Sequence, residues 1–378
     1  MPNHQWNNPS SNSFALSSEE YDLAVPNAAS LMQSLRAFGY DIATAVADLI
    51  DNSITAQANR ISVQFEWNNG NPWISISDNG YGMTEDELFE AMKPGSKNPL
   101  DERSENDLGR FGLGLKTASL SQCKRLTVAS KKDGGRICCR CWDLDVVTQK
   151  NAWLLLKVPT ETAATIIQKH LDKCPSGTIV IWEKIDRIIP GEHVGDEEYQ
   201  RAFLNYAQSV KERISVVFSS YMSGPHKVAF EMNGREISMW DPFMTDNPLT
   251  TRMPTEYLYV NGNEVKIKTF ILPHQKKLSS NEFSLYAGAH GWNAQQGFYI
   301  FRNNRLIVEG SWLLNGFEKA EQYRLARIRI DIGNETDSEW NIDVRKSTAV
   351  PPISIQNDIK RIAIAARRES ATIFRNRG

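Results

Sequence analysis

No stretch of the sequence approaches the ~20 consecutive apolar residues that a membrane-spanning helix needs. The first residues, MPNHQWNNPSSNSF, are polar and lack the charged and apolar regions of a secretory signal. Five cysteines in 378 residues are too few for a disulfide framework. The formal net charge of −2 gives no overall attraction to nucleic acid or anionic lipid. We therefore expect a cytoplasmic protein without membrane association, whose contacts with nucleic acid would depend on a local patch.

Three of the five cysteines, Cys138, Cys139 and Cys141, lie in one strand-like run, where alternation directs Cys139 and Cys141 to the same face. A zinc site of the usual spacing needs a second pair of ligands. Neither Cys123 nor Cys174 has a cysteine nearby in the sequence. Reduced structural thiols are therefore the expected state of all five.

The length suits two domains, because single domains usually hold ~100–200 residues. The composition changes after Pro190-Gly191-Glu192, and we place a domain boundary near residue 192. The expected parts are an N-terminal arm at 1–27, a first domain at 28–192 and a second domain at 193–378 that ends in a helix. Helices that precede and interleave with antiparallel strands indicate an α+β sandwich rather than a doubly wound sheet.

Local patterns place the first elements. Apolar spacing over 28–58 is helical, and Gly39-Tyr40-Asp41 divides it into two helices with Asp41 as an N-cap. Thr84 followed by three acidic residues predicts the start of a short helix over 84–92. The other elements expected before residue 222 are strands at 61–67, 73–77, 125–130, 135–142, 153–158 and 178–184, and helices at 113–122, 161–172 and 196–221.

The first chemical motif is Ala47-Asp48-Leu49-Ile50-Asp51-Asn52-Ser53 on the second helix. Asp48 and Asn52 are four residues apart, so they share one face of the helix. A carboxylate and a carboxamide in this arrangement hold an attacking water and a hard cation together. A plain amphipathic helix with a solvated polar face remains the alternative.

Two further motifs adjoin strands. Asp78-Asn79-Gly80-Tyr81-Gly82-Met83 follows a strand, and its glycines allow the backbone to approach a ligand. A carboxylate at this position accepts the exocyclic amino proton of adenine. Thr178 begins the apolar strand Gly177–Trp182, where its hydroxyl is placed to brace that contact. An ordinary turn and an ordinary strand remain the alternatives.

The remaining motif is the glycine cluster Gly109-Arg110-Phe111-Gly112-Leu113-Gly114-Leu115-Lys116-Thr117. It lies at a helix start, where free backbone N–H groups and the helix dipole favour phosphate. The spacing fits neither a dinucleotide-binding nor a Walker motif. The polar segment 93–110 before it has no periodicity, and long loops of this kind within compact domains are commonly lids.

The order of these motifs, D-x-x-x-N, DxGxGM, a polar lid, GxxGxG and GT before an apolar strand, resembles the Bergerat nucleotide-binding fold of the GHKL superfamily. This superfamily comprises gyrase B, the ninety-kilodalton chaperones, MutL, histidine kinases and MORC proteins, and the resemblance covers residues 28–185. It implies ATP and Mg²⁺ as cofactors, with Asp48 as the general base and Asn52 as the Mg²⁺ ligand. The other nucleotide-binding residues that it implies are Asp78, Gly80, Gly82, Met83, Ser96, Lys97, Gly109, Gly112, Leu113, Gly114, Lys116, Thr117 and Thr178.

One position departs from the family pattern. Hydrolytic members usually carry glutamate where this chain has Asp48. Aspartate is one methylene shorter, about 1.5 Å of reach, and catalytic geometry tolerates little slack. We therefore expect slow hydrolysis. Asp51 is a weaker candidate for the base, because one step of ~100° around the helix separates it from Asn52.

In the second half, Phe298–Phe301, an Asn303-Asn304 turn and Leu306–Val308 predict a β-hairpin. Together with the downstream string IDVRKS, this hairpin resembles the ribosomal-S5-like transducer domain of MutL, MORC and type II topoisomerase subunits. The resemblance implies that Lys346, or otherwise Arg345, reaches the γ-phosphate from the second domain. Loss of such a contact on hydrolysis makes domain orientation report the bound nucleotide.

These features predict a Mg²⁺-dependent ATPase that acts as a conformational switch or clamp. The resemblance is nearest to MORC-like bacterial ATPases and implies an ATP-dependent homodimer in a DNA-associated or anti-phage process. A nucleotide-sensing scaffold with little turnover is the alternative. A histidine kinase is disfavoured, because no histidine lies on a dimerisation helix before the ATPase motifs.

The final helix is rich in basic residues, namely Lys360, Arg361, Arg367, Arg368, Arg375 and Arg377. Both a DNA contact and the polar face of a packed helix fit this pattern. Because the chain stops within this basic region, we expect a further C-terminal effector or dimerisation segment, or an effector partner that supplies it.

Overall fold

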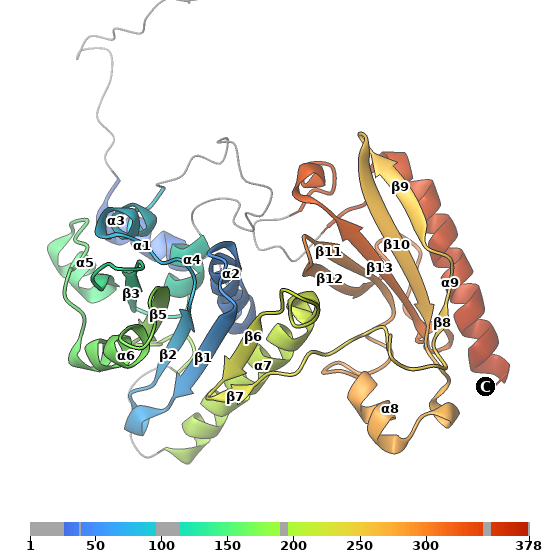
Figure 1. The fold of residues 1–378 in the computed structure, drawn as a ribbon, viewed down its shortest axis with the longest axis horizontal. Coiled ribbons are helices and arrows are strands. Elements are labelled where there is room, and N and C mark those ends of the chain that lie inside the picture. Colours follow the sequence, from blue (N-terminus) through green and yellow to red (C-terminus); the bar gives the residue numbers. More distant parts are fainter. Residues whose placement is uncertain (1–25, 38, 96–113, 190–195, 343–348, 377–378) are drawn as a thin grey trace, which may run out of the picture.

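A computed structural model describes residues 26–37, 39–95, 114–189, 196–342 and 349–376. Two β-sheets lie side by side, each carrying its own helices (Figure 1). The arrangement is α+β, as predicted from the order of helices and strands. Among the described residues, no helix is both long enough and apolar enough to span a membrane.

The first sheet has seven strands in the order β4-β3-β5-β2-β1-β6-β7. All neighbouring strands are antiparallel except β1 and β6, which run parallel. The bounds are β1 Arg60–Glu66, β2 Trp73–Asp78, β3 Arg125–Lys131, β4 Cys138–Asp143, β5 Gly177–Glu183, β6 Ala229–Met232 and β7 Arg235–Glu236.

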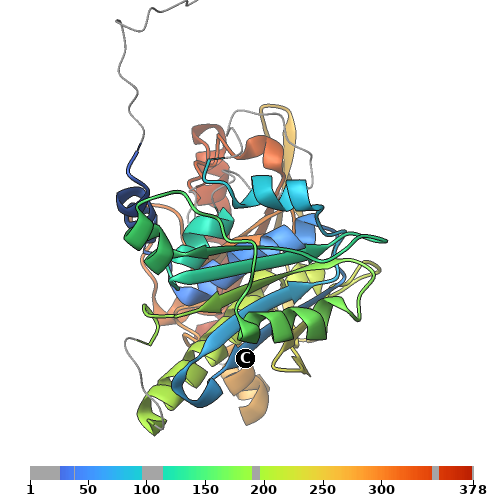
Figure 2. The same cartoon turned by 90° about the vertical axis from the view of Figure 1, so that its left-hand side faces the viewer.

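Helices cover both faces of this sheet, as Figure 2 shows from the side. The helix α6 packs on one face through Ile166, Ile167 and Leu171. The helices α1, α2, α3, α4, α5 and α7 pack around a larger core on the opposite face. The bounds are α1 Ala28–Arg36, α2 Ile42–Thr55, α3 Glu85–Met92, α4 Gly114–Leu120, α5 Leu144–Lys150, α6 Glu161–Leu171 and α7 Glu197–Val217. The helix α2 is central, because it contacts β2, α4 and α7.

The second sheet has the order β12-β11-β13-β10-β8, and β9 also pairs with β10. The long C-terminal helix α9 covers one face through Ile359, Ile362 and Ala363. The bounds are β8 Thr251–Arg252, β9 Glu256–Val260, α8 Ser280–Tyr286, β10 Asn263–Ile271, β11 Gly297–Arg302, β12 Arg305–Ser311, β13 Ala326–Ile332 and α9 Gln356–Asn376.

The two sheets are joined by a shared apolar core. Phe270, Tyr299, Phe301 and Leu306 of the second sheet belong to the same buried cluster as the core of the first. The boundary predicted near residue 192 precedes strands β6 and β7, which belong to the first sheet. The first sheet continues to Glu236, the last residue of β7, because β6 pairs with β1 at the edge of that sheet.

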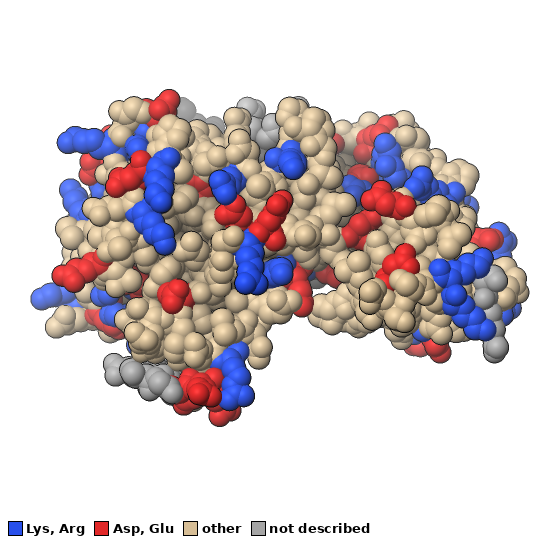
Figure 3. All heavy atoms as spheres, turned by 60° about the horizontal axis from the view of Figure 1, so that its bottom comes forward, with Lys and Arg blue, Asp and Glu red and all other residues tan. Residues whose placement is uncertain are grey.

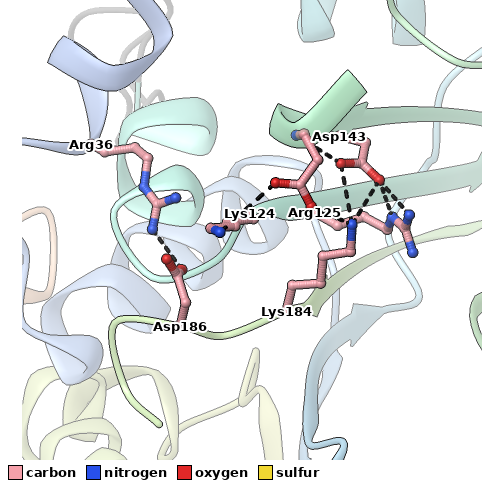
Figure 4. Close-up of polar contacts among 7 residues, drawn as sticks. Arg36, Lys124, Arg125, Asp143, Lys184 and Asp186 are labelled. Carbon is pink, nitrogen blue, oxygen red and sulfur yellow. Dashed lines mark hydrogen bonds and ion pairs between the residues drawn. The ribbon is translucent and has the colours of Figure 1, made fainter. Parts of the chain in front are cut away.

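Ion pairs hold α1 and the outer strands of the first sheet together (Figure 4). Arg36 at the end of α1 pairs with Asp186 at 2.6 Å. The buried carboxylate of Asp143 accepts hydrogen bonds from Arg125 at 2.7 Å and Lys184 at 3.3 Å. These contacts join the ends of β3, β4 and β5. They therefore stabilise this side of the first sheet, to which β5 with Thr178 belongs.

Most of the predicted elements are present, with ends shifted by a few residues. The strand predicted at 153–158 is wrong, because only an isolated bridge between Cys141 and Leu156 forms there. The helix α5 at Leu144–Lys150 was not predicted, although Asp143 caps its first turn. All five cysteines are unpaired thiols, which agrees with the absence of a disulfide framework.

The basic residues of α9 take part in packing within the chain. Arg361 forms ion pairs with Glu256 and Asp358. Arg367 lies over the ring of Tyr323, 3.9 Å from its centroid, and also contacts two further aromatic rings. Figure 3 shows Lys and Arg interspersed with Asp and Glu on one face of the molecule. The packed-helix interpretation therefore accounts for these two arginines.

Candidate nucleotide-binding site

The helix α2 carries the first motif on its second half. Asp41 caps its first turn by accepting a hydrogen bond from the Thr44 amide, as predicted. Asp48 and Asp51 are buried, whereas Asn52 is exposed. The apolar residues of the motif pack in the core, so the polar residues project from a helix that is held firmly.

Asp78, the last residue of β2, lies at the buried floor of the site. Its Oδ1 accepts a hydrogen bond from the Gly80 amide at 2.9 Å, and its Oδ2 accepts one from the Ser53 hydroxyl at 2.8 Å. Burial raises the pKa of the carboxyl above its ordinary value, and these hydrogen bonds offset part of that rise. A buried carboxylate held by two donors is a fixed acceptor, as adenine recognition requires.

The structure brings Thr178 beside Asp78, because the two residues face each other across β5 and β2. The Thr178 hydroxyl lies 2.8 Å from the Ser130 hydroxyl, which in turn accepts a hydrogen bond from the Met83 amide at 2.8 Å. Asp78, Met83 and Thr178 therefore belong to one polar cluster. Sequence reasoning missed Ser130 and Ser53, although Ser53 directly follows Asn52 in the first motif.

Gly80 and Gly82 leave no room for a side chain. A Cβ on Gly80 would lie 2.6 Å from the Ala56 carbonyl oxygen. A Cβ on Gly82 would lie 2.0 Å from the Lys131 carbonyl oxygen, and the φ of Gly82 is +67°. The turn after β2 therefore packs directly against the backbone of Ala56 and Lys131, and both positions need glycine.

The described part of the glycine cluster forms the start of α4. The Lys116 ammonium is buried and donates hydrogen bonds of 2.8 Å to the carbonyls of Ala91 and Lys93, at the end of α3. Thr117 is also buried, and Gly114 is partly exposed. The phosphate contact of Lys116 stays a prediction.

A residue of the second domain reaches α2. The Nε of Arg305, at the start of β12, donates a hydrogen bond of 2.7 Å to Asp51 Oδ1. Its guanidinium also lies 3.3 Å from Asp48 Oδ1. Sequence reasoning predicted the hairpin that contains this arginine but assigned no role to Arg305. The only signal was the position of this arginine directly after the turn.

Residues 40–178 match the family model of the histidine kinase-, DNA gyrase B- and HSP90-like ATPases. This range contains Asp48, Asn52, Asp78 and Thr178, which the structure places on neighbouring elements. Residues 40–178 form a GHKL ATPase domain. The predicted resemblance is thereby confirmed for the first domain.

Similar curated proteins bear MutL and MORC names. The chain is 38% identical over 90 residues to the DNA mismatch repair protein MutL of Thermotoga maritima, covering 23% of this chain and 17% of the relative. It is 30% identical over 91 residues to the ATPase morc-1 of Caenorhabditis elegans, covering 24% and 10%. A longer match, 23% identical over 265 residues, to MutL of Histophilus somni covers 64% of this chain and 42% of that protein. The chain thus spans less than half the length of these relatives.

Several predicted site residues lie outside the part of the chain that the structure describes. In the GHKL domain these are Ser96, Lys97, Gly109, Gly112 and Leu113, and in the second domain Lys346. The ends of the segment that contains Lys346 are held in place. The Val350 amide donates a hydrogen bond of 2.7 Å to the carbonyl of Trp340, which is fully buried.

The described residues contain no group of three or more His, Cys, Asp or Glu side chains that would hold a metal ion by themselves. The Mg²⁺ ligand role of Asn52 stays a prediction. A separate cleft of about 1180 Å³ lies between α2, α7 and the α8 region, lined by residues such as Tyr40, Arg213 and Trp240. Among the described residues, none of those predicted to bind nucleotide lines it.

Proposed function

We propose that this protein binds ATP with Mg²⁺ in the GHKL domain, hydrolyses it slowly and uses it to drive a conformational switch. ATP binding closes the switch into a homodimer, which serves a DNA-associated process. The observation that carries this proposal is the position of α2. One side of this helix contacts the predicted adenine carboxylate through Ser53, and another contacts the second domain through Arg305. A change at the nucleotide therefore has a direct path to the second sheet.

The roles follow from the chemistry of the residues. Asp78 accepts the adenine amino proton, and the turn at Gly80 and Gly82, packed on the backbone of Ala56 and Lys131, shapes the pocket beside it. Asn52 is exposed on α2 and holds the cation that neutralises the phosphates. Asp48 lies one turn before Asn52 and takes the proton of the attacking water. ATP supplies the bond that is broken, and these side chains supply orientation and a proton acceptor.

Lys346 completes the switch in this proposal by binding the γ-phosphate from the second domain. Trp340 and Ala349, on either side of its segment, belong to the second core, and the Val350 amide bonds the Trp340 carbonyl. A charge-assisted contact of ~1.5–3 kcal/mol is enough to shift a two-state equilibrium by about 10- to 100-fold. The names of the relatives, which include DNA mismatch repair proteins, support a DNA-associated process.

The test is the mass of the protein with a non-hydrolysable ATP analogue and Mg²⁺, measured by light scattering. We expect a dimer with the analogue and a monomer with ADP. The variant Asp78→Asn is the control and should need about 10- to 100-fold more analogue to dimerise. A wild-type protein that remains monomeric with saturating analogue would show that the clamp proposal is wrong.

A nucleotide-sensing scaffold is a second candidate, favoured by the short side chain of Asp48 and its contact with Arg305. The phosphate release rates of wild type, Asp48→Ala and Asp48→Glu separate the two functions. A slow switch predicts that Asp48→Ala loses turnover. Equal rates near the background in all three proteins, with ATP binding intact, would support the scaffold.

A further inference from the structure

Arg305 is a buried cation from the second domain placed among carboxylates of the first. Its side chain is 1% exposed, and those of Asp51 and Asp48 are 1% and 6% exposed. A buried guanidinium is costly unless carboxylates compensate for its lost hydration. The contact therefore binds the two domains to each other at the helix that carries the proposed general base.

The hairpin that delivers Arg305 is rigid. Asn303 and Asn304 form its turn with φ values of +46° and +67°, which are typical of a tight two-residue hairpin. The Tyr221 hydroxyl, from the segment after α7, donates a hydrogen bond to the Asn303 carbonyl at 2.5 Å. At the other end of the turn, Arg302 forms a two-point contact with Asp337 at 2.6 and 2.7 Å. The guanidinium of Arg305 is thus positioned by the fold of the second domain.

The two carboxylates are held unequally. The contact with Asp51 is the shorter, at 2.7 Å against 3.3 Å for Asp48. Asp51 therefore anchors the guanidinium, and the guanidinium restrains one oxygen of Asp48. Because Asp48 is a methylene shorter than glutamate, its orientation matters more for reaching a water.

We propose that Arg305 is a positioning residue for ATP hydrolysis: anchored on Asp51, it orients the Asp48 carboxylate, so that turnover requires the second domain to be docked on α2. This inference rests on the proposed role of Asp48 as the base. It also assigns a function to Asp51. This residue is buried and lies off the helix face that Asp48 and Asn52 share. The inference also makes the hydrolysis rate depend on domain arrangement independently of Lys346.

A purely structural ion pair would give a different result. Arg213 of α7 pairs with Glu309 of β12 at 3.4 Å, and this contact also joins the first domain to the second. Arg213 donates its hydrogen bond to Glu309, whereas its interaction with Asp48 is a charge–charge attraction without a hydrogen bond. If Arg305 only held the domains together, Arg305→Met would lower the free energy of unfolding without lowering the kcat of the folded protein.

The test uses the full chain with the variants Arg305→Met, Arg305→Lys and Arg213→Met. Binding of a fluorescent ATP analogue and steady-state phosphate release are measured for each. We expect Arg305→Met to lower kcat by about 10- to 100-fold while the Kd for the analogue changes by less than about twofold. Arg305→Lys should recover part of kcat, because lysine keeps the charge but lacks the fork that spans two carboxylates. Arg213→Met should keep the wild-type kcat.

A second readout needs no nucleotide. Amide hydrogen exchange in peptides from α2 should be faster in Arg305→Met than in wild type, and unchanged in Arg213→Met. If Arg305→Met does not fold, Asp51→Asn removes the anchor instead and should lower kcat with the same unchanged analogue affinity. A wild-type kcat in the folded variant, or equal losses in Arg305→Met and Arg213→Met, would overturn the inference and leave the proposed function intact. A wild-type protein that binds ATP but releases no phosphate would instead refute the hydrolysis on which the inference rests.

Discussion

The Ser53 hydroxyl donates a hydrogen bond of 2.8 Å to Asp78 Oδ2 and so joins the helix of the proposed base to the floor of the proposed adenine pocket. These residues come from motifs 25 positions apart in the sequence. The bond leaves the Asp78 carboxylate fixed on both of its oxygens, since the Gly80 amide occupies the other. Its geometry makes Asp78 the most direct test of nucleotide recognition.

The variant Asp78→Asn tests whether Asp78 binds the nucleotide. Loss of the charged acceptor should weaken ATP binding by about 10- to 100-fold, because hydrogen bonds to charged groups contribute ~1.5–3 kcal/mol. Titration calorimetry measures this change. An unchanged affinity would show that Asp78 does not contact the nucleotide.

The same variant has a predicted pH dependence of stability. Burial raises the pKa of Asp78 in the folded state, so the folded protein favours the protonated carboxyl. The stability of the wild type should therefore fall as the pH rises from the ordinary carboxyl value of 3.8 through the raised pKa. Asp78→Asn lacks this loss. Its thermal midpoint, relative to wild type, should rise with pH over this range, and a constant difference would contradict the assignment.

Gly82→Ala should be far more harmful than Gly134→Ala. The two glycines have nearly the same φ, +67° and +69°, so the backbone cost of adding a Cβ is similar. Only Gly82 is crowded, because its Cβ would lie 2.0 Å from the Lys131 carbonyl oxygen, whereas the space around Gly134 is open. We expect Gly82→Ala to lower the free energy of unfolding by about 1–3 kcal/mol more than the control. Denaturant titration measures both values, and equal losses would exclude crowding as the cause.

Tyr221→Phe should loosen the hairpin of the second domain. The variant loses the hydrogen bond to the Asn303 carbonyl, which should cost about 0.5–1.5 kcal/mol. Burial raises the pKa of Tyr221 to about 12, so the neutral phenol stabilises the folded protein below pH 10. This stabilisation should disappear as the pH rises from 10 toward 12, and the difference between variant and wild type should shrink.

Thermal unfolding at neutral and alkaline pH measures the effect of Tyr221→Phe. Tyr206→Phe is the matched control, because Tyr206 lies on α7 with a side chain that is 39% exposed. The control should unfold at the wild-type temperature. Equal midpoints for both variants would show that the bond to Asn303 adds nothing to stability.

Local chemistry made much of the fold predictable. Asp41 caps α2, and Thr84 forms a capping box with Glu87, because these side chains satisfy free amides within three residues of themselves. The Asn303–Asn304 turn forms for a similar reason, since asparagine tolerates positive φ. The α+β arrangement followed from the order of such elements. The failure at 153–158 arose because apolar residues there pack beside the sheet and pair with it only through the bridge between Cys141 and Leu156.

The sequence by itself determined the motifs of the ATPase domain, the caps and turns, and the absence of any apolar run long enough to span a membrane. Only the tertiary structure decided that β6 extends the first sheet, and that Arg305 meets Asp51 across 254 residues. The physical reason is range. Caps, turns and periodicity are set by neighbours along the chain, whereas a buried ion pair forms only where two folded surfaces bring both charges out of water together.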